Sequence, residues 1–158
     1  MEKDLIKHQN MLVDAGTGVL LFAIWNVAKV NLYLGLSLFP IKEVYEIAAL
    51  YEIDEKFFLI LMVIILVAIL LYQFGIRTFI GLAAIAEGKG KPKSWTYLVL
   101  AVFLLITDLQ TYWLAFDVDQ IMTDAAVDVI TGLCMEAVSM YILVELIISG
   151  FRVKKLKK

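Results

Sequence analysis

The sequence predicts an all-α integral membrane protein, a single domain (1–158) built as a bundle of four transmembrane helices with both termini in the cytoplasm. Of its 158 residues, 62% are hydrophobic, and a mean hydropathy of +0.87 is too high for a soluble domain of ordinary composition. Four apolar stretches follow one another, each as long as the roughly 20 residues that a helix needs to cross the hydrocarbon core. Basic residues flank alternate ends of these stretches, which is typical of a multi-pass membrane protein.

The stretch 57–86 is strongly apolar, and Gln73 and Arg77 are its main polar interruptions. It can span the membrane with some tilt. Arg77 lies well inside the stretch, where an ionised side chain costs several kcal/mol unless it is paired or hydrated. We therefore expect a partner for Arg77. The other three spans are expected at about 11–39, 95–116 and 125–151.

Shorter segments precede and join the spans. Residues 1–10 are polar and suit a helix start or a lead-in at the membrane surface. Residues 41–56 are acidic but keep apolar residues at helical spacing, which predicts a short amphipathic helix at the outer interface between the first and second spans. Ser94 follows a helix-breaking run of glycine and proline and can cap the third span. The remaining expected features are a cap for the fourth span at Thr123 or Asp124 and a basic tail at 152–158.

The basic residues predict the orientation of the helices, because cytoplasmic flanking segments are enriched in Lys and Arg. They gather in three segments that lie at alternate ends of successive spans, so both termini are expected in the cytoplasm. The two acidic connections are expected to face outward. The expected location is a cell membrane, most simply a bacterial inner membrane. The basic residues are Lys3, Lys7, Lys89, Lys91, Lys93, Arg152, Lys154, Lys155, Lys157 and Lys158.

Polar side chains within the first and third spans fall on definite helix faces, because residues three, four and seven apart share one side. Asn26, Lys29 and Tyr33 form one such stripe on the first span. Asp108 and Thr111 form another on the third span. Each stripe is expected to face protein rather than lipid.

The fourth span carries two glutamates on different faces. Glu136 shares its side with Gly132 and Ser139, and such small residues permit close approach of a neighbouring helix. Glu136 is therefore expected to point into protein. Glu145 lies about half a turn away by angle, so one interface cannot easily bury both glutamates.

Helical rise gives the depth of each charge in its span. Lys29, Asp108 and Glu136 fall near the middle third, whereas Arg77 and Glu145 fall nearer the cytoplasmic side. These depths predict that Lys29 pairs with Asp108 or Glu136, and that Arg77 pairs with Glu145.

Two functions remain open at this point. In the first, the charged network lines a path that passes a proton, an ion or a small polar solute, and Asp108 or Glu136 changes protonation. In the second, the protein is a noncatalytic accessory or assembly subunit of a membrane complex, and the charges form an ion-pair lock between helices. The residues of the predicted network are Asn26, Lys29, Tyr33, Gln73, Arg77, Asp108, Thr111, Glu136 and Glu145.

Catalysis, cofactors and metal binding are not expected. The sequence has one cysteine, Cys134, and one histidine, His8, which are too few for a thiol redox pair or a metal cluster of these residues. The basic tail is explained by topology, so no nucleic acid is expected. The expected partners are the lipid bilayer and either further copies of the chain or a companion membrane subunit.

Overall fold

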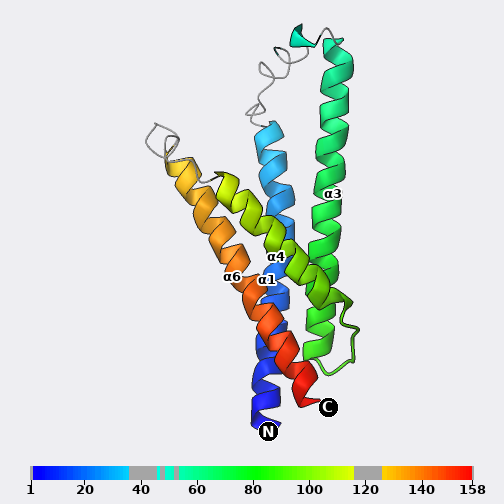
Figure 1. The fold of residues 1–158 in the computed structure, drawn as a ribbon, viewed down its shortest axis with the longest axis vertical. Helices are drawn as coiled ribbons and strands as arrows, with labels where there is room; N and C mark the ends of the chain where they lie inside the picture. The colour runs from blue at the N-terminus through cyan, green and yellow to red at the C-terminus, as the bar shows by residue number, and fades with distance from the viewer. Residues whose placement is uncertain (1, 36–45, 47–48, 52–53, 116–125, 158) are drawn as a thin grey trace. The chain divides into compact units, whose positions relative to one another are not determined.

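A computed structural model of the protein describes residues 2–35, 46, 49–51, 54–115 and 126–157. Four long helices account for nearly all of these residues (Figure 1). By length and composition each helix is long and apolar enough to cross a membrane, so the predicted all-helical architecture with four such helices is confirmed. The helices are α1 (Glu2–Gly35), α3 (Glu55–Gly88), α4 (Thr96–Ala115) and α6 (Ala126–Leu156).

Two expected elements lie wholly or largely outside the described residues. They are the interfacial helix at 41–56 and the cap of the fourth span at Thr123 or Asp124. At its other end, the fourth helix differs from the prediction. It continues past 151 to Leu156, so most of the basic tail is helical. The last turns are held to the rest of the protein because Val153 and Lys154 are buried.

Local sequence explains where α3 begins and ends. The Asp54 carboxylate accepts a hydrogen bond of 2.8 Å from the Phe57 amide, which satisfies one of the amides left free at a helix N-terminus. After Gly88 the chain leaves the helix through Gly90, whose φ of +89° is accessible mainly to glycine. At the start of α4 the Ser94 hydroxyl donates to the Thr96 hydroxyl at 3.0 Å. The side chain of this expected cap therefore bonds to another side chain.

The residues form two compact units, which are described separately. The first comprises Met1–Phe22 and Arg77–Lys158, and the second comprises Ala23–Ile76. α1 and α3 each contribute one part to each unit. The expectation of a single domain stays a prediction. In the second unit the α3 side chains are mostly exposed and apolar, as suits a lipid-facing helix.

Both termini lie at the same end of the first unit (Figure 1). A guanidinium nitrogen of Arg152, near the C-terminus, lies 3.5 Å from Nε2 of His8, near the N-terminus. The connection before α4 reaches the same end, because Lys154 Nζ donates to the Lys93 carbonyl oxygen at 2.7 Å. The three basic segments of the sequence therefore meet at one end of this unit.

In the first unit α1 and α3 approach each other through glycines. A Cβ at Gly81 would lie 2.8 Å from the Gly16 carbonyl oxygen and 2.7 Å from Leu20 Cγ. A Cβ at Gly88 would lie 2.7 Å from the Gln9 carbonyl oxygen. Small residues at a membrane helix interface let backbones come this close.

The buried side chains of the first unit form stripes at helical spacing, three or four residues apart. On α4 the stripe ends in Asp108, on α3 it begins with Arg77, and on α6 it includes Ser139. These three polar residues therefore occupy core positions of their helices. The apolar members are Leu12, Ala15 and Val19 on α1, Ile80, Ala83 and Ala84 on α3, Tyr97, Leu98, Ala101 and Leu104 on α4, and Leu143, Leu146 and Val153 on α6.

Candidate functional site

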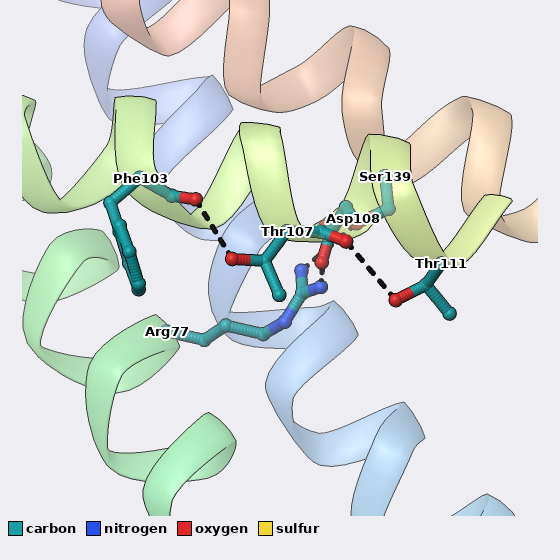
Figure 2. Close-up of polar contacts among 6 residues, drawn as sticks. All are labelled: Arg77, Phe103, Thr107, Asp108, Thr111 and Ser139. Atoms are coloured by element: carbon teal, nitrogen blue, oxygen red, sulfur yellow. Dashed lines mark hydrogen bonds and ion pairs between the residues drawn. The ribbon is translucent and has the colours of Figure 1, made fainter. Parts of the chain in front are cut away.

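The candidate site is a buried ion pair that joins three helices of the first unit. Arg77 extends from α3 to Asp108 on α4 and to Ser139 on α6 (Figure 2). One guanidinium nitrogen, Nη2, lies 2.7 Å from Asp108 Oδ2, and the other, Nη1, donates to the Ser139 hydroxyl at 2.9 Å. The exposed fractions are 3% for Arg77, 6% for Asp108 and 3% for Ser139. We call these three residues the Arg77 cluster, and all three side chains are buried.

Helix geometry brings the Arg77 cluster to one depth. Arg77 precedes the C-terminal residue of α3, Gly88, by 11 residues, and Asp108 follows the first residue of α4, Thr96, by 12 residues. At 1.5 Å per residue these separations are about 16 and 18 Å. Because the connection between α3 and α4 is short, the two helices start from nearly the same level. The two charged groups therefore meet.

The predicted pairing of Arg77 with Glu145 is wrong. Arg77 binds Asp108 instead, and Glu145 forms no hydrogen bond or ion pair with the described residues. The prediction is wrong because it compares the depth of each charge as a fraction of its own span. α3 has 34 residues and α4 has 20, so equal fractions of the two helices are unequal distances from their shared end.

The pairing of Lys29 with Asp108 or Glu136 stays a prediction. Lys29 belongs to the second unit, and both acidic residues belong to the first. Lys29 and Glu136 are half-buried and each has an interaction partner. Within the first unit the cation bound to Asp108 is Arg77.

Thr111 does not join the Arg77 cluster, although it shares a face of the third span with Asp108. Its hydroxyl donates to the Thr107 carbonyl oxygen of its own helix at 3.0 Å, and the Thr107 hydroxyl donates in the same way to Phe103 (Figure 2). Serine and threonine hydroxyls in membrane helices commonly donate to the carbonyl oxygen four residues earlier. Helical spacing predicted the shared face correctly but could not predict this local bond.

The other predicted network residues are dispersed. Asn26 and Gln73 are half-buried in the second unit. Tyr33 lies in α1, but its side chain falls outside the described part of the chain. Glu136 and Glu145 are half-buried on α6 of the first unit. Of the predicted network, the structure of the first unit thus brings together Arg77 and Asp108.

Two polar atoms, one on Arg77 and one on the residue that follows it, have no hydrogen-bond partner among the described residues. They are Nε of Arg77 and the hydroxyl oxygen of Thr78, which are both buried. A buried donor without an acceptor costs about 1–3 kcal/mol. A water molecule beside either atom would satisfy it.

A second buried ion pair lies at the end of the unit where the termini meet. Lys154 Nζ donates to Glu87 Oε1 at 3.0 Å and to the Lys93 carbonyl oxygen at 2.7 Å. It also lies 5.1 Å from the ring centroid of Trp95 and 5.5 Å from that of Tyr97, within the range of a cation–π contact. These contacts connect the ends of α3 and α6 to the start of α4.

Sequence reasoning missed this second ion pair. The sequence pattern predicts for Lys154 only a place among the basic residues that determine topology, and it predicts no partner for Glu87. The signal was the position of Glu87 as the acidic residue that opens a basic connection. An acidic residue in a basic flanking segment lies near the cations of the other basic segments that reach the same end of the bundle.

We expect Lys154→Met to destabilise the protein by about 2–3 kcal/mol, because it leaves the buried Glu87 carboxylate without its cation. Glu87→Gln is expected to cost less, since an amide oxygen can still accept a hydrogen bond from Lys154. Thermal unfolding in detergent measures both. Lys155→Met, one residue further on and exposed, is the matched control. An equal loss in all three variants would contradict a specific role for this ion pair.

No group of three or more His, Cys, Asp or Glu side chains suited to a metal ion occurs among the described residues. Cys134 is exposed and carries a free thiol. No protein-family model, no curated protein and no solved structure matches the chain. Function must therefore be argued from the geometry of the two ion pairs and the surfaces around them.

Proposed function

We propose that this small multi-pass membrane protein is a noncatalytic accessory or assembly subunit, and that the Arg77 cluster is a structural lock. The observation that carries the proposal is the closed ion pair between Arg77 and Asp108 at 2.7 Å. A path for ions or solutes needs charged groups that water can reach. In the Arg77 cluster the charges meet each other, and the exposed fractions of 6% or less leave little access.

Glu145 supports a role in assembly. It lies within the apolar part of α6, is half-buried and has no hydrogen-bond or ion-pair partner among the described residues. An ionisable group in hydrocarbon is costly without a partner. A companion helix, or a second copy of the chain, that brings a basic or hydrogen-bonding residue to Glu145 removes this cost.

The proposed location is a cell membrane, with both termini and the connection between α3 and α4 in the cytoplasm. The support is the gathering of the three basic segments at one end of the first unit, where Lys154 contacts Lys93 and Arg152 contacts His8. Basic segments of multi-pass proteins remain on the cytoplasmic side.

Passage of a proton, an ion or a small polar solute is the second candidate function. It is favoured by Nε of Arg77 and the hydroxyl of Thr78, which have no hydrogen-bond partner among the described residues and which water molecules would satisfy. In this alternative Asp108 exchanges its proton when the pair with Arg77 opens.

Flux measurements separate the two functions. We expect liposomes that contain the purified protein to pass protons and potassium ions no faster than protein-free liposomes under an imposed gradient. Asp108→Asn and Glu136→Gln are the paired variants. The lock proposal expects no flux in any sample and a lower unfolding temperature for Asp108→Asn, because the amide cannot balance the buried guanidinium charge. Wild-type flux that both variants abolish while remaining folded would establish passage and overturn the lock.

The assembly role is tested in the same preparation. Protein extracted from its own membrane in a mild detergent should have a protein mass well above the 17.8 kDa of one chain by light scattering. Glu145→Leu should shift it toward a single chain. The control is Tyr141→Leu, one turn away and 68% exposed. A wild-type protein that is a single chain under these conditions would contradict the assembly role.

A further inference from the structure

A pocket of about 340 Å³ opens at the end of the first unit where the three basic segments meet. It lies between the start of α4 and the last turns of α6. The aromatic rings of Trp95 and Phe151 line it, with centroids 5.3 Å apart and planes inclined at 59°. Arg152, Lys154 and Lys155 complete the lining. The pocket thus combines an aromatic wall with three cations and contains no acidic lining residue among the described part of the chain.

The cations of the pocket differ in what they bind already. Lys154 Nζ is occupied by Glu87 and by the Lys93 carbonyl oxygen, so its charge is largely balanced. Arg152 and Lys155 are exposed, and the contact recorded for Arg152 is a weak one of 3.5 Å to His8. Among the described residues no acidic side chain pairs with Arg152 or Lys155, so these two positive charges beside the pocket can bind an anion.

The position of the pocket matches the boundary of the membrane. Trp95 directly precedes the apolar helix α4, and tryptophan is enriched where a helix enters the headgroup region. Trp95 and Phe151 are each about half exposed, at 46% and 48%. Their rings can therefore contact the upper part of a lipid chain while the cations remain at headgroup level.

We propose that this pocket binds one anionic phospholipid. Arg152 and Lys155 hold the headgroup phosphate, for which Arg offers a planar two-donor fork, and the rings of Trp95 and Phe151 pack against the glycerol and first acyl carbons. Lys154 orients the wall, because its pair with Glu87 holds the end of α6 against α3 and its contact with the Trp95 ring holds it against the start of α4. The site is independent of the lock and of any passage function.

Quenching of Trp95 fluorescence tests the site directly. The protein carries three tryptophans, so Trp25→Phe and Trp113→Phe leave Trp95 as the reporter in detergent micelles. The probes are phosphatidylglycerol and phosphatidylcholine, each brominated near the glycerol end of one acyl chain. We expect saturable quenching by brominated phosphatidylglycerol at concentrations at which the phosphatidylcholine probe quenches weakly.

A matched pair of double variants distinguishes a pocket from general attraction to positive charge. The double variant Arg152→Gln with Lys155→Gln should raise the concentration of brominated phosphatidylglycerol needed for half-maximal quenching about 25-fold, at about fivefold for each basic residue removed. The double variant Lys89→Gln with Lys91→Gln removes the same charge from exposed positions outside the pocket. It should change the concentration needed for half-maximal quenching less than twofold. The single variant Lys155→Gln, with an expected fivefold loss, serves if the double variant fails to fold.

Three outcomes would overturn the proposal. The first is equal quenching by the two brominated lipids, which would mean that the pocket is filled by any acyl chain. The second is an equal loss in both double variants, which would reduce the effect to net charge. The third is full protection of Trp95 by millimolar inorganic phosphate, which would assign the cations to a free anion instead of a lipid.

Discussion

Replacing Arg77 with alanine is expected to lower the free energy of unfolding by about 3–5 kcal/mol, the typical cost of breaking a buried ion pair. The variant leaves the Asp108 carboxylate, at 6% exposure, without a cation and the Ser139 hydroxyl without its donor. Asp108 lies 7 residues from the nearer end of α4, Ala115, and Ser139 lies 13 residues from the nearer end of α6, Ala126, which correspond to about 10 and 20 Å. Both side chains are buried, so water cannot easily replace the lost contacts. Thermal unfolding in detergent, followed by size-exclusion chromatography, measures the loss.

The pair can be removed without leaving a charge behind. The double variant Arg77→Met with Asp108→Leu is expected to recover most of the stability lost in Arg77→Ala, because apolar residues of similar volume often replace a buried ion pair at little cost. The charge-swapped variant Arg77→Asp with Asp108→Arg should recover part of it. Lys91→Ala, at an exposed position, controls for the loss of a positive charge. If both double variants are as unstable as Arg77→Ala, the contact between Arg77 and Asp108 is not the source of the effect.

The same double variant bears on function. A lock needs only that the two side chains fit together, so an apolar pair can replace it and the protein should still assemble. A proton or ion path needs the charges themselves, and the apolar pair would abolish it while leaving a stable protein. Both proposed functions therefore expect a stable double variant without flux, and they differ in whether the wild-type protein shows a flux that the double variant has lost.

The four helices could be predicted because hydrophobic length is a strong signal in a membrane protein. Backbone groups in lipid must bond within the helix, so an apolar stretch such as 57–86 has few alternatives. The ends were predicted less well. The last span continues past 151, where Val153 is buried and Lys154 pairs with Glu87 of α3, and such tertiary interactions leave no trace in local composition.

The candidate site was predicted in part. Spacing correctly indicated that Arg77 and Asp108 are inward-facing residues that require partners, because a charge in an apolar span is costly. It did not predict that they pair with each other, since the choice among Asp108, Glu136 and Glu145 depends on the relative heights of the helices. The short connection between α3 and α4 sets that height and favours partners on these neighbouring helices.

Ser139 shows a further limit of sequence reasoning. Its place on an inward face beside Glu136 was predicted, yet it was treated as a small residue that permits close packing. In the structure its hydroxyl accepts a hydrogen bond from Arg77. A small polar residue can serve both roles, and only the position of the neighbouring arginine decides between them.

Gly81→Leu is expected to have the second large effect, because α1 and α3 touch at this glycine. A Cβ there would lie 2.8 Å from the Gly16 carbonyl oxygen, and a backbone atom cannot move aside as a flexible side chain can. Even Gly81→Ala should cost about 1–3 kcal/mol, the range for overpacking a well-packed site, and leucine should cost more. Thermal unfolding in detergent again provides the measurement.

Gly132 on α6 is the matched control. A Cβ at Gly132 would meet no atom of the described residues within 4 Å, so Gly132→Ala should be neutral or stabilise the helix by up to about 1 kcal/mol. If Gly81→Ala lowers the free energy of unfolding and Gly132→Ala raises it, close helix contact, and not helix propensity, sets the requirement for glycine. Equal effects would mean that α1 and α3 are not held together through Gly16 and Gly81. The Arg77 cluster and the ion pair of Glu87 with Lys154 would then have to hold this part of α3 in the bundle without that contact.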